Sequence, residues 1–133
     1  MKTIVYVAGP YNNDDRSIVD ENIGAAREVA ITLVEIGYGV IVPHLNTYKF
    51  EDRCDTAHYE DFQQMYLKLM IKASDCVLFL PGWEKSQGCI MEQTVAEAID
   101  LPYYTKLKNL TNAFPPTLLP KGINPSTLSI NKI

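Results

Sequence analysis

The sequence lacks the features that mark several common protein classes. None of its apolar runs is long enough to span a membrane, and the first, residues 3–8, is shorter than the apolar region of a secretory signal. Its three cysteines (Cys54, Cys76 and Cys89) show no C-x-x-C spacing, which disfavours a disulfide framework and a zinc site. The net charge of -4 comes without a dense Lys/Arg block, so a nucleic-acid polymer is not an expected partner. We therefore expect a cytoplasmic protein that binds neither membranes nor nucleic acids.

The composition is typical of one globular domain. Hydrophobic residues make up 47% and charged residues 21% of the 133 positions. A chain of this size buries roughly two thirds of its unfolded surface, so we expect one soluble domain with one core. We assign residues 1–106 to this domain. Residues 107–133 contain four prolines and little periodicity, and we interpret them as a tail that is either disordered or placed at an oligomer interface.

Short apolar segments alternate with amphipathic ones along the first 105 residues. Strands are predicted over residues 3–8, 40–42, 76–80 and 102–105, helices over residues 17–36, 56–72 and 88–100, and a loop over residues 43–55. Ser17 is the expected N-cap of the first helix. The apolar faces that indicate the three helices contain Ile18, Val29, Leu33, Val34, Phe62, Met65, Leu69, Met70, Ile90, Val95 and Ala98.

This alternation predicts a single α/β domain built on a doubly wound parallel sheet, with helices on both faces. A ligand site is expected beyond the carboxyl ends of the strands, at the point where the strand order reverses. The loops at residues 9–16 and 81–88 follow the first and third strands. These two loops should therefore meet at the ligand site.

Glu92 is the first candidate for chemistry, because it falls near the start of the third predicted helix. The positive end of a helix stabilises a carboxylate, and it equally stabilises a phosphate bound to free backbone N–H groups. Ser86 adds a hydroxyl at this end, and Gly88 allows a ligand to approach the backbone closely. The pattern alone also fits a Glu that only satisfies the helix dipole.

Three aromatic residues are further candidates, each with a structural alternative. Tyr6 lies near the carboxyl end of the first strand, where its hydroxyl can donate a hydrogen bond to Glu92, although a buried Tyr also fits simple core packing. His44 follows the second strand at the same edge, where it either contacts a ligand or is satisfied by local hydrogen bonds. Trp83 follows Gly82 and fits either stacking on a planar ligand or packing on the core.

Two acidic features favour structural roles. Asp75 precedes the third strand, at the end opposite the expected site, where capping is the simpler role. Residues 12–15 (Asn-Asn-Asp-Asp) lack the alternating spacing and terminal Glu of a calcium-binding loop, so we interpret them as a solvated turn.

Three segments together resemble the nucleoside 2-deoxyribosyltransferase superfamily. They are YVAGPY at residues 6–11, the strand at residues 75–80, and PGWEKSQGCIMEQTVAEAIDLP at residues 81–102. The most specific part is Tyr-x-x-Gly at Tyr6 combined with Ser-x-Gly-x-x-x-Glu, which ends at Glu92. The last segment is similar to a small bacterial and phage branch near the 2′-deoxynucleoside 5′-monophosphate N-glycosidases.

The resemblance implies a flavodoxin-like (Rossmann-like) fold and cleavage of the N-glycosidic bond of a nucleoside or its 5′-monophosphate. It implies that Glu92 is the nucleophile that attacks C1′ and that Tyr6 orients it. Attack by water on the resulting glycosyl-enzyme gives hydrolysis, and attack by a second base gives transfer. The resemblance implies no metal or organic cofactor. It does imply a homodimer or larger homo-oligomer.

The resemblance also favours a phosphorylated substrate. Relatives that act on free nucleosides typically carry a carboxylate where this chain has Ser86, and a carboxylate would repel a phosphate. The residues expected to bind the substrate are Gly9, Pro10, Asn12, His44, Trp83, Ser86 and Gly88. Because residues 10–12 replace the Ser-x-Arg segment of the N-glycosidases, phosphate contacts would also fall to Asn12, Asn13 or Arg16.

A second departure concerns the leaving base. The family usually places an Asp, which helps to protonate that base, where this chain has Leu67. Proton donation to a leaving group is typically worth roughly 10² to 10⁴ in rate, so a substitute is needed for fast turnover. The sequence offers Glu60, Asp61 and His44 as substitutes.

From the sequence we expect a hydrolase that releases a free base and a sugar 5-phosphate from a (2′-deoxy)nucleoside 5′-monophosphate. One alternative is a nucleoside 2-deoxyribosyltransferase that moves the sugar between bases. The other is a non-catalytic nucleotide-binding or sensing module, which Leu67 makes credible.

Overall fold

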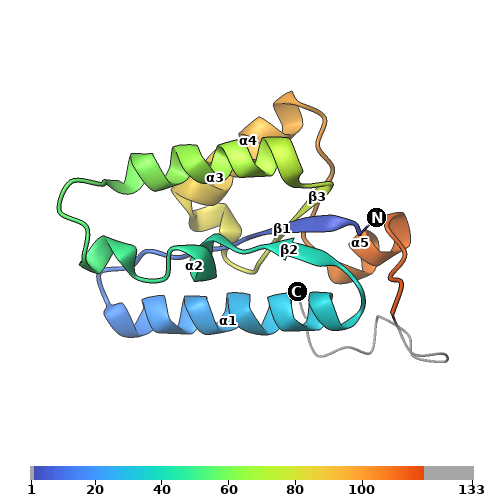
Figure 1. Cartoon of the computed structure of the whole chain (residues 1–133), viewed down its shortest axis with the longest axis horizontal. Helices are drawn as coiled ribbons and strands as arrows, with labels where there is room; N and C mark the ends of the chain where they lie inside the picture. Colours follow the sequence, from blue (N-terminus) through green and yellow to red (C-terminus); the bar gives the residue numbers. More distant parts are fainter. Residues whose placement is uncertain (1, 119–133) are drawn as a thin grey trace.

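The computed structural model describes residues 2–118 and shows a parallel sheet between two layers of helices (Figure 1). In chain order the elements are β1 (Ile4–Ala8), α1 (Arg16–Glu35), β2 (Gly39–Ile41), α2 (Pro43–Asn46), the 3₁₀ helix η1 (Phe50–Asp52), α3 (Tyr59–Ala73), β3 (Cys76–Phe79), the 3₁₀ helix η2 (Trp83–Lys85), α4 (Gln87–Ala98), β4 (Tyr103–Tyr104) and α5 (Leu107–Ala113).

The four strands lie in the order β2-β1-β3-β4, and every pair is parallel. β1 is central, since Val5 is in register with Val40 on one side and with Cys76 on the other. The chain therefore moves outward from β1 in one direction to β2 and in the opposite direction through β3 to β4. The predicted single α/β domain with a doubly wound parallel sheet is confirmed.

Side chains of the two central strands alternate between two buried clusters. Val5, Val7, Cys76 and Leu78 pack with residues of α1 and α5. Tyr6, Ala8, Val77 and Phe79 pack with residues of α3 and α4. Because both sheet faces are covered, the strands carry apolar residues at successive positions and do not alternate apolar with polar ones, as expected for a buried parallel sheet.

The first helix begins one residue earlier than predicted. Its N-cap is Asp15, whose Oδ1 accepts a hydrogen bond from the Ser17 backbone N–H at 2.9 Å. Asn13 holds Asp15 in place, because its Oδ1 accepts a hydrogen bond from the Asp15 N–H at 2.9 Å. The prediction of Ser17 as the cap is wrong, since an Asx turn two residues upstream supplies the better acceptor.

The structure also corrects which side chains the helices bury. On α1 the buried residues are Val19, Ile23, Ala26, Val29, Ala30 and Leu33, whereas Val34 is exposed. On α3 they are Tyr66 and Met70, and on α4 they are Cys89 and Ala96. Met65, Leu69, Ile90 and Ala98 from the predicted apolar faces are exposed. Hydrophobicity alone did not determine how each helix is rotated about its axis, because large apolar residues flank the buried stripe on both sides.

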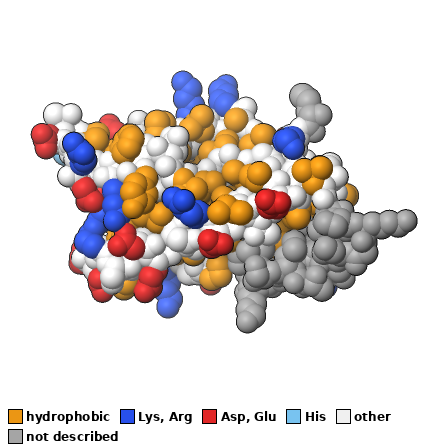
Figure 2. Space-filling model, turned by 60° about the horizontal axis from the view of Figure 1, so that its bottom comes forward, with side chains coloured by type: hydrophobic (Ala, Val, Ile, Leu, Met, Phe, Trp, Pro, Cys, Tyr) orange, Lys and Arg blue, Asp and Glu red, His pale blue; other side chains and the backbone are white. Residues whose placement is uncertain are grey.

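The side of the molecule turned forward in Figure 2 mixes hydrophobic side chains with charged ones of both signs. Ile31 and Val34, on the outer side of α1, are about half exposed.

Among residues 2–118, no helix combines the length and the apolar character needed to cross a membrane.

The predicted loop at residues 43–55 contains two short helices instead. Pro43 occupies the first turn of α2, where its fixed φ and missing N–H suit the start of a helix. Lys49, at a left-handed φ of 54°, precedes η1. These short elements carry His44 and Glu51 to the edge of the sheet.

Asp75 has the structural role predicted from its place before β3. Its Oδ2 accepts a hydrogen bond from the Ile4 N–H at 2.7 Å, and its own N–H donates to the Ile4 carbonyl at 2.8 Å. The two bonds start the β1–β3 pairing at the end of the sheet away from the cavity.

The first part of the predicted tail belongs to the core. Residues 107–113 form α5, and Leu107 and Leu110 are completely buried against the α1 side of the sheet. The Leu118 N–H donates to the Ile36 carbonyl at 3.1 Å, which ties the chain to the end of α1. The rest of the predicted tail, residues 119–133, lies outside the described residues.

We predict that Leu110→Ala lowers the free energy of unfolding by about 2–5 kcal/mol, because it deletes a fully buried side chain from a packed core. Urea unfolding monitored by circular dichroism measures this. Ile31→Ala, on the half-exposed outer side of α1, is the matched control and should change stability by less than about 1 kcal/mol. Equal effects of the two substitutions would show that α5 is not part of the cooperative core.

Candidate functional site

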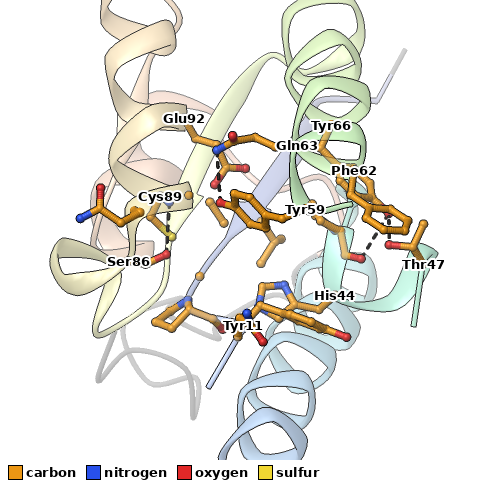
Figure 3. Close-up of a pocket in the computed structure, with 18 of the residues that line it drawn as sticks. Tyr11, His44, Thr47, Tyr59, Phe62, Gln63, Tyr66, Ser86, Cys89 and Glu92 are labelled. Carbon is orange, nitrogen blue, oxygen red and sulfur yellow. Dashed lines mark hydrogen bonds between the residues drawn. The ribbon is translucent and has the colours of Figure 1, made fainter. Parts of the chain in front are cut away.

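A cavity of about 540 Å³ lies at the carboxyl ends of β1 and β3 (Figure 3). Its walls come from residues 6–12, the segment from α2 to η1, the first half of α3, and residues 85–92 at the start of α4. The loops after β1 and β3 meet here, as predicted, since a Cβ on Gly82 would lie 3.2 Å from the Pro10 ring. A cavity of this size suits a small molecule.

Glu92 and Tyr6 form the inner wall of the cavity. α4 begins at Gln87, so Glu92 lies in its second turn, near the start of the helix as predicted. Burial raises the pKa of Glu92 to about 7, and the Tyr6 hydroxyl partly offsets that effect. Desolvation therefore outweighs the effect of the Tyr6 hydroxyl at this carboxyl group, and the group titrates near neutral pH.

The Tyr6 side chain is completely buried. Its hydroxyl meets no partner at full hydrogen-bond geometry among the described residues, yet it lies near enough to Glu92 for the two groups to shift each other's pKa. Burial and then the negative charge of Glu92 raise the pKa of Tyr6. Tyr6 therefore stays protonated and presents an O–H donor to the carboxylate.

The α4 end of the cavity consists of Lys85, Ser86, Gln87 and Gly88. Ser86 is the N-cap of α4, and its Oγ accepts a hydrogen bond from the Cys89 N–H at 3.2 Å. The Ser86 hydroxyl proton is left to donate to a ligand. With the free N–H groups of the first turn and the basic residue Lys85 in its lining, this end of the cavity is suited to an anion.

Gly88 gives room to an aromatic side chain from α3. A Cβ at this position would lie 2.6 Å from the Tyr59 hydroxyl, so only glycine lets Tyr59 approach the start of α4 as it does. The Tyr59 hydroxyl accepts a hydrogen bond from Gln63 Nε2 at 3.2 Å. Figure 3 shows Tyr59 between the Ser86 side of the cavity and the side formed by Phe62 and Thr47.

The α2 end of the cavity consists of Tyr11, His44, Thr47 and Glu51. His44 is 4% exposed, and its Nε2 lies 2.8 Å from the Pro10 carbonyl oxygen, so Nε2 carries the proton and donates it. Nδ1 has no partner among the described residues. Burial lowers the pKa of His44, so the ring is neutral at pH 7 and Nδ1 is a hydrogen-bond acceptor.

Glu51 belongs to a network of hydrogen bonds and ion pairs at the α2 end of the cavity. The Tyr11 hydroxyl donates to Glu51 Oε2 at 2.7 Å, and Arg16 Nη2 lies 3.1 Å from the same oxygen and 3.0 Å from Asp52 Oδ1. Although burial acts to raise it, hydrogen bonds from Tyr11 and Arg16 lower the pKa of Glu51. Arg16 is therefore engaged by two carboxylates, which argues against the phosphate contact predicted for it.

Six of the seven predicted substrate-binding residues line the cavity, namely Gly9, Pro10, Asn12, His44, Ser86 and Gly88. Trp83 is the exception. Its ring packs against Phe79 at a centroid distance of 5.0 Å and is not part of the cavity wall. Of the two alternatives for Trp83, the structure favours core packing.

Most of the residues considered as proton donors to the leaving base lie outside the cavity wall. Leu67 packs partly buried against the α3–α4 cluster, and neither Glu60 nor Asp61 lines the cavity. Asp61 is used locally, since its Oδ2 accepts a hydrogen bond from the His58 N–H at 2.8 Å. Of the substitutes that the sequence offered, His44 alone contributes to the cavity wall.

Several cavity residues carry no signal in the sequence. Lys85 and Glu51 lie in segments without periodicity, and no motif singles them out. Tyr59, Phe62 and Tyr66 are spaced as one face of α3, a pattern that signals helix packing and does not reveal a cavity. No three His, Cys, Asp or Glu side chains within residues 2–118 come together as a metal site would require.

We predict that Glu92→Gln stabilises the protein in a pH-dependent way. Because burial raises the pKa of Glu92 from 4.5 to about 7, the folded state holds this proton more tightly than the unfolded chain does. Wild-type stability should therefore rise as pH falls from 7 toward 4.5. At pH 8 the neutral Gln should raise the free energy of unfolding by roughly 1–2 kcal/mol, and at pH 5 by much less.

Urea unfolding of both proteins at pH 5 and pH 8 measures the difference. Glu97→Gln on the exposed side of α4 is the matched control, and its effect should not grow between the two pH values. A Glu92→Gln effect that is the same at both pH values would contradict the burial of this carboxyl group.

Comparison of the sequence with protein-family models gives a match. The model of the family described as domain of unknown function DUF4406 matches residues 3–104, and no curated protein matches the sequence. The matched span runs from β1 to β4 and includes every segment that lines the cavity. Because the family model covers well over half of the chain, this protein belongs to the DUF4406 family.

Proposed function

We propose that this protein hydrolyses the N-glycosidic bond of a (2′-deoxy)nucleoside 5′-monophosphate. The observation that carries the proposal is the buried Tyr6 hydroxyl beside the Glu92 carboxyl group on the wall of a cavity of nucleotide size. The resemblance of the segments that hold these residues to the nucleoside 2-deoxyribosyltransferase superfamily supports it independently. A partly buried Glu with a raised pKa in a cavity is also a common sign of a catalytic residue.

In the proposed reaction, a carboxylate oxygen of Glu92 attacks C1′ of the sugar while the bond from C1′ to the base nitrogen breaks. The base leaves with the electron pair of the broken bond. Water then attacks C1′ of the glycosyl ester, the carboxylate of Glu92 departs, and sugar 5-phosphate is released, while the proton that the water loses balances the one that the departed base takes up from solvent. Tyr6 is a positioning residue. Its O–H donates toward the carboxylate, limits the rise in pKa that burial causes, and keeps part of the Glu92 population ionised.

The phosphate is proposed to bind at the α4 end of the cavity. Gln87 and Gly88 supply free N–H groups of the first helical turn, and Ser86 supplies a hydroxyl donor. Lys85 adds a positive charge, which takes over the role that the sequence suggested for Arg16. A phosphate bound at this end directs C1′ of the sugar toward Glu92, which lies in the second turn of α4.

A second candidate function is a nucleotide-binding module without turnover. The observation that favours it is Leu67, an apolar residue packed into the α3–α4 cluster. At this position the nucleoside 2-deoxyribosyltransferase superfamily usually has the Asp that protonates the leaving base. Such a module would bind a nucleotide at the same cavity and release no base.

We predict that the protein releases free base from at least one nucleoside 5′-monophosphate, and that Glu92→Gln lowers kcat by about 10³-fold or more because the nucleophile is lost. Chromatography of a panel of ribo- and deoxyribonucleotides measures base release. Glu97→Gln is the control on the same helix and should retain activity. Since the reaction needs ionised Glu92, kcat/KM should rise with pH through about 7.

Three outcomes separate the candidate functions. Activity retained in Glu92→Gln would rule out Glu92 as the nucleophile. Binding of a nucleotide by the wild type without release of base would favour the binding module. Formation of a new nucleotide when a second free base is added would favour the transferase.

We predict that Ser86→Asp weakens binding of 5′-monophosphates by about tenfold or more, because it adds a carboxylate next to the phosphate while preserving an acceptor for the helix cap. Calorimetric titration of nucleotides and matching nucleosides into Glu92→Gln and into the double variant measures the change. Binding of the nucleosides should change much less. A parallel loss for both classes would contradict a phosphate site at Ser86.

A further inference from the structure

The two ends of the cavity differ in charge. The α4 end has a helix N-terminus and the basic residue Lys85, whereas the α2 end has the acidic residue Glu51. Around Glu51 one cation, Arg16, pairs with two carboxylates, so the cluster of Arg16, Glu51 and Asp52 retains one net negative charge. A ligand that matches this cavity is negative at one end and positive at the other.

The side chains between the two ends are aromatic. Tyr59 and Phe62 reach the cavity from α3, and Tyr11 reaches it from the loop after β1. Tyr11 also packs edge-on against His44, at a centroid distance of 5.4 Å. Aromatic faces attract cations as well as planar rings, so this lining fits a planar cationic ring better than an aliphatic ammonium group.

The acidic and imidazole groups of the α2 end, Glu51 and His44, offer a leaving base no proton. Glu51 is held ionised by Tyr11 and Arg16, and the buried His44 is held neutral, with its Nε2 proton committed to the Pro10 carbonyl. Nδ1 of His44 is buried, carries no proton and has no partner among the described residues.

Building on the glycosidase function proposed above, we propose that the preferred substrate is a nucleoside 5′-monophosphate whose glycosidic ring nitrogen is already cationic, such as a pyridinium or an N7-alkylated purine. The aromatic lining and Glu51 bind the cationic ring, and the α4 end binds the phosphate. In such a substrate the electron pair of the breaking C1′–N bond neutralises the ring nitrogen. The base therefore departs neutral without receiving a proton.

The rest of the reaction balances with groups already in place. The Glu92 carboxylate forms an ester with C1′, and the attacking water later breaks that ester and loses one proton to solvent. The products are the neutral base, sugar 5-phosphate and one proton. Neutral substrates, by contrast, need a proton on the leaving base, a step typically worth roughly 10² to 10⁴ in rate.

The test compares release of base from nicotinamide mononucleotide and N7-methylguanosine 5′-monophosphate with release from the neutral nucleotides GMP, UMP and dUMP. Each kcat/KM is divided by the uncatalysed rate of the same compound, because cationic glycosides are intrinsically more labile. We expect the cationic substrates to exceed the neutral ones by at least about 10²-fold before this correction and to retain an advantage after it. Glu92→Gln should abolish turnover of both classes.

Binding provides a readout that does not depend on turnover. In the Glu92→Gln background, nicotinamide mononucleotide should bind about tenfold more tightly than its reduced form, which has an uncharged ring of the same shape. Adding Glu51→Gln should remove most of that preference. Adding Glu28→Gln, the same charge change on the outer side of α1, should leave it intact.

The outcomes distinguish this inference from the proposed function. If neutral nucleotides are hydrolysed as well as cationic ones after correction, the inference is wrong and the glycosidase function stands. Equal affinity for the oxidised and reduced mononucleotides would also overturn it. If no nucleotide of either class loses its base, the proposed function fails and the inference fails with it.

Discussion

The pairing of β1 with β3 is the contact on which the site depends. The register aligns Tyr6 with Val77 and Ala8 with Phe79, and it brings the loop after β1 against the loop after β3. Because successive side chains of β1 face opposite sides of the sheet, Tyr6 faces α3 and α4 while its neighbours face α1. One strand pairing thus brings a buried hydroxyl to the helix that holds Glu92.

Two opposing effects act on the pKa of Glu92, and burial has the larger one. Desolvation raises its pKa, and the hydroxyl of Tyr6 counters only part of the rise. The protein therefore keeps a destabilising carboxylate at neutral pH, although a neutral isostere would fit the same space. Such a conflict with local stability is expected at functional sites and is uncommon elsewhere.

The short elements after β2 complete the cavity with groups in defined protonation states. α2 buries His44 against the Pro10 carbonyl, and η1 brings Glu51 to Tyr11 and Arg16. Each of these contacts joins residues more than 30 positions apart in sequence. The cavity consequently combines a cationic end, an aromatic middle and an anionic end, all held by one small domain.

The sequence by itself determined the order of the four strands and the three long helices, the parallel sheet and the edge where a cavity forms, since these follow from apolar periodicity and general rules of connection. It also pointed to Tyr6, Ser86 and Glu92. Only the tertiary structure decided how the helices rotate and what Glu51, Lys85 and Trp83 contact. The physical reason is that a side chain's protonation state and ligand access depend on neighbours from distant segments, which no local pattern encodes.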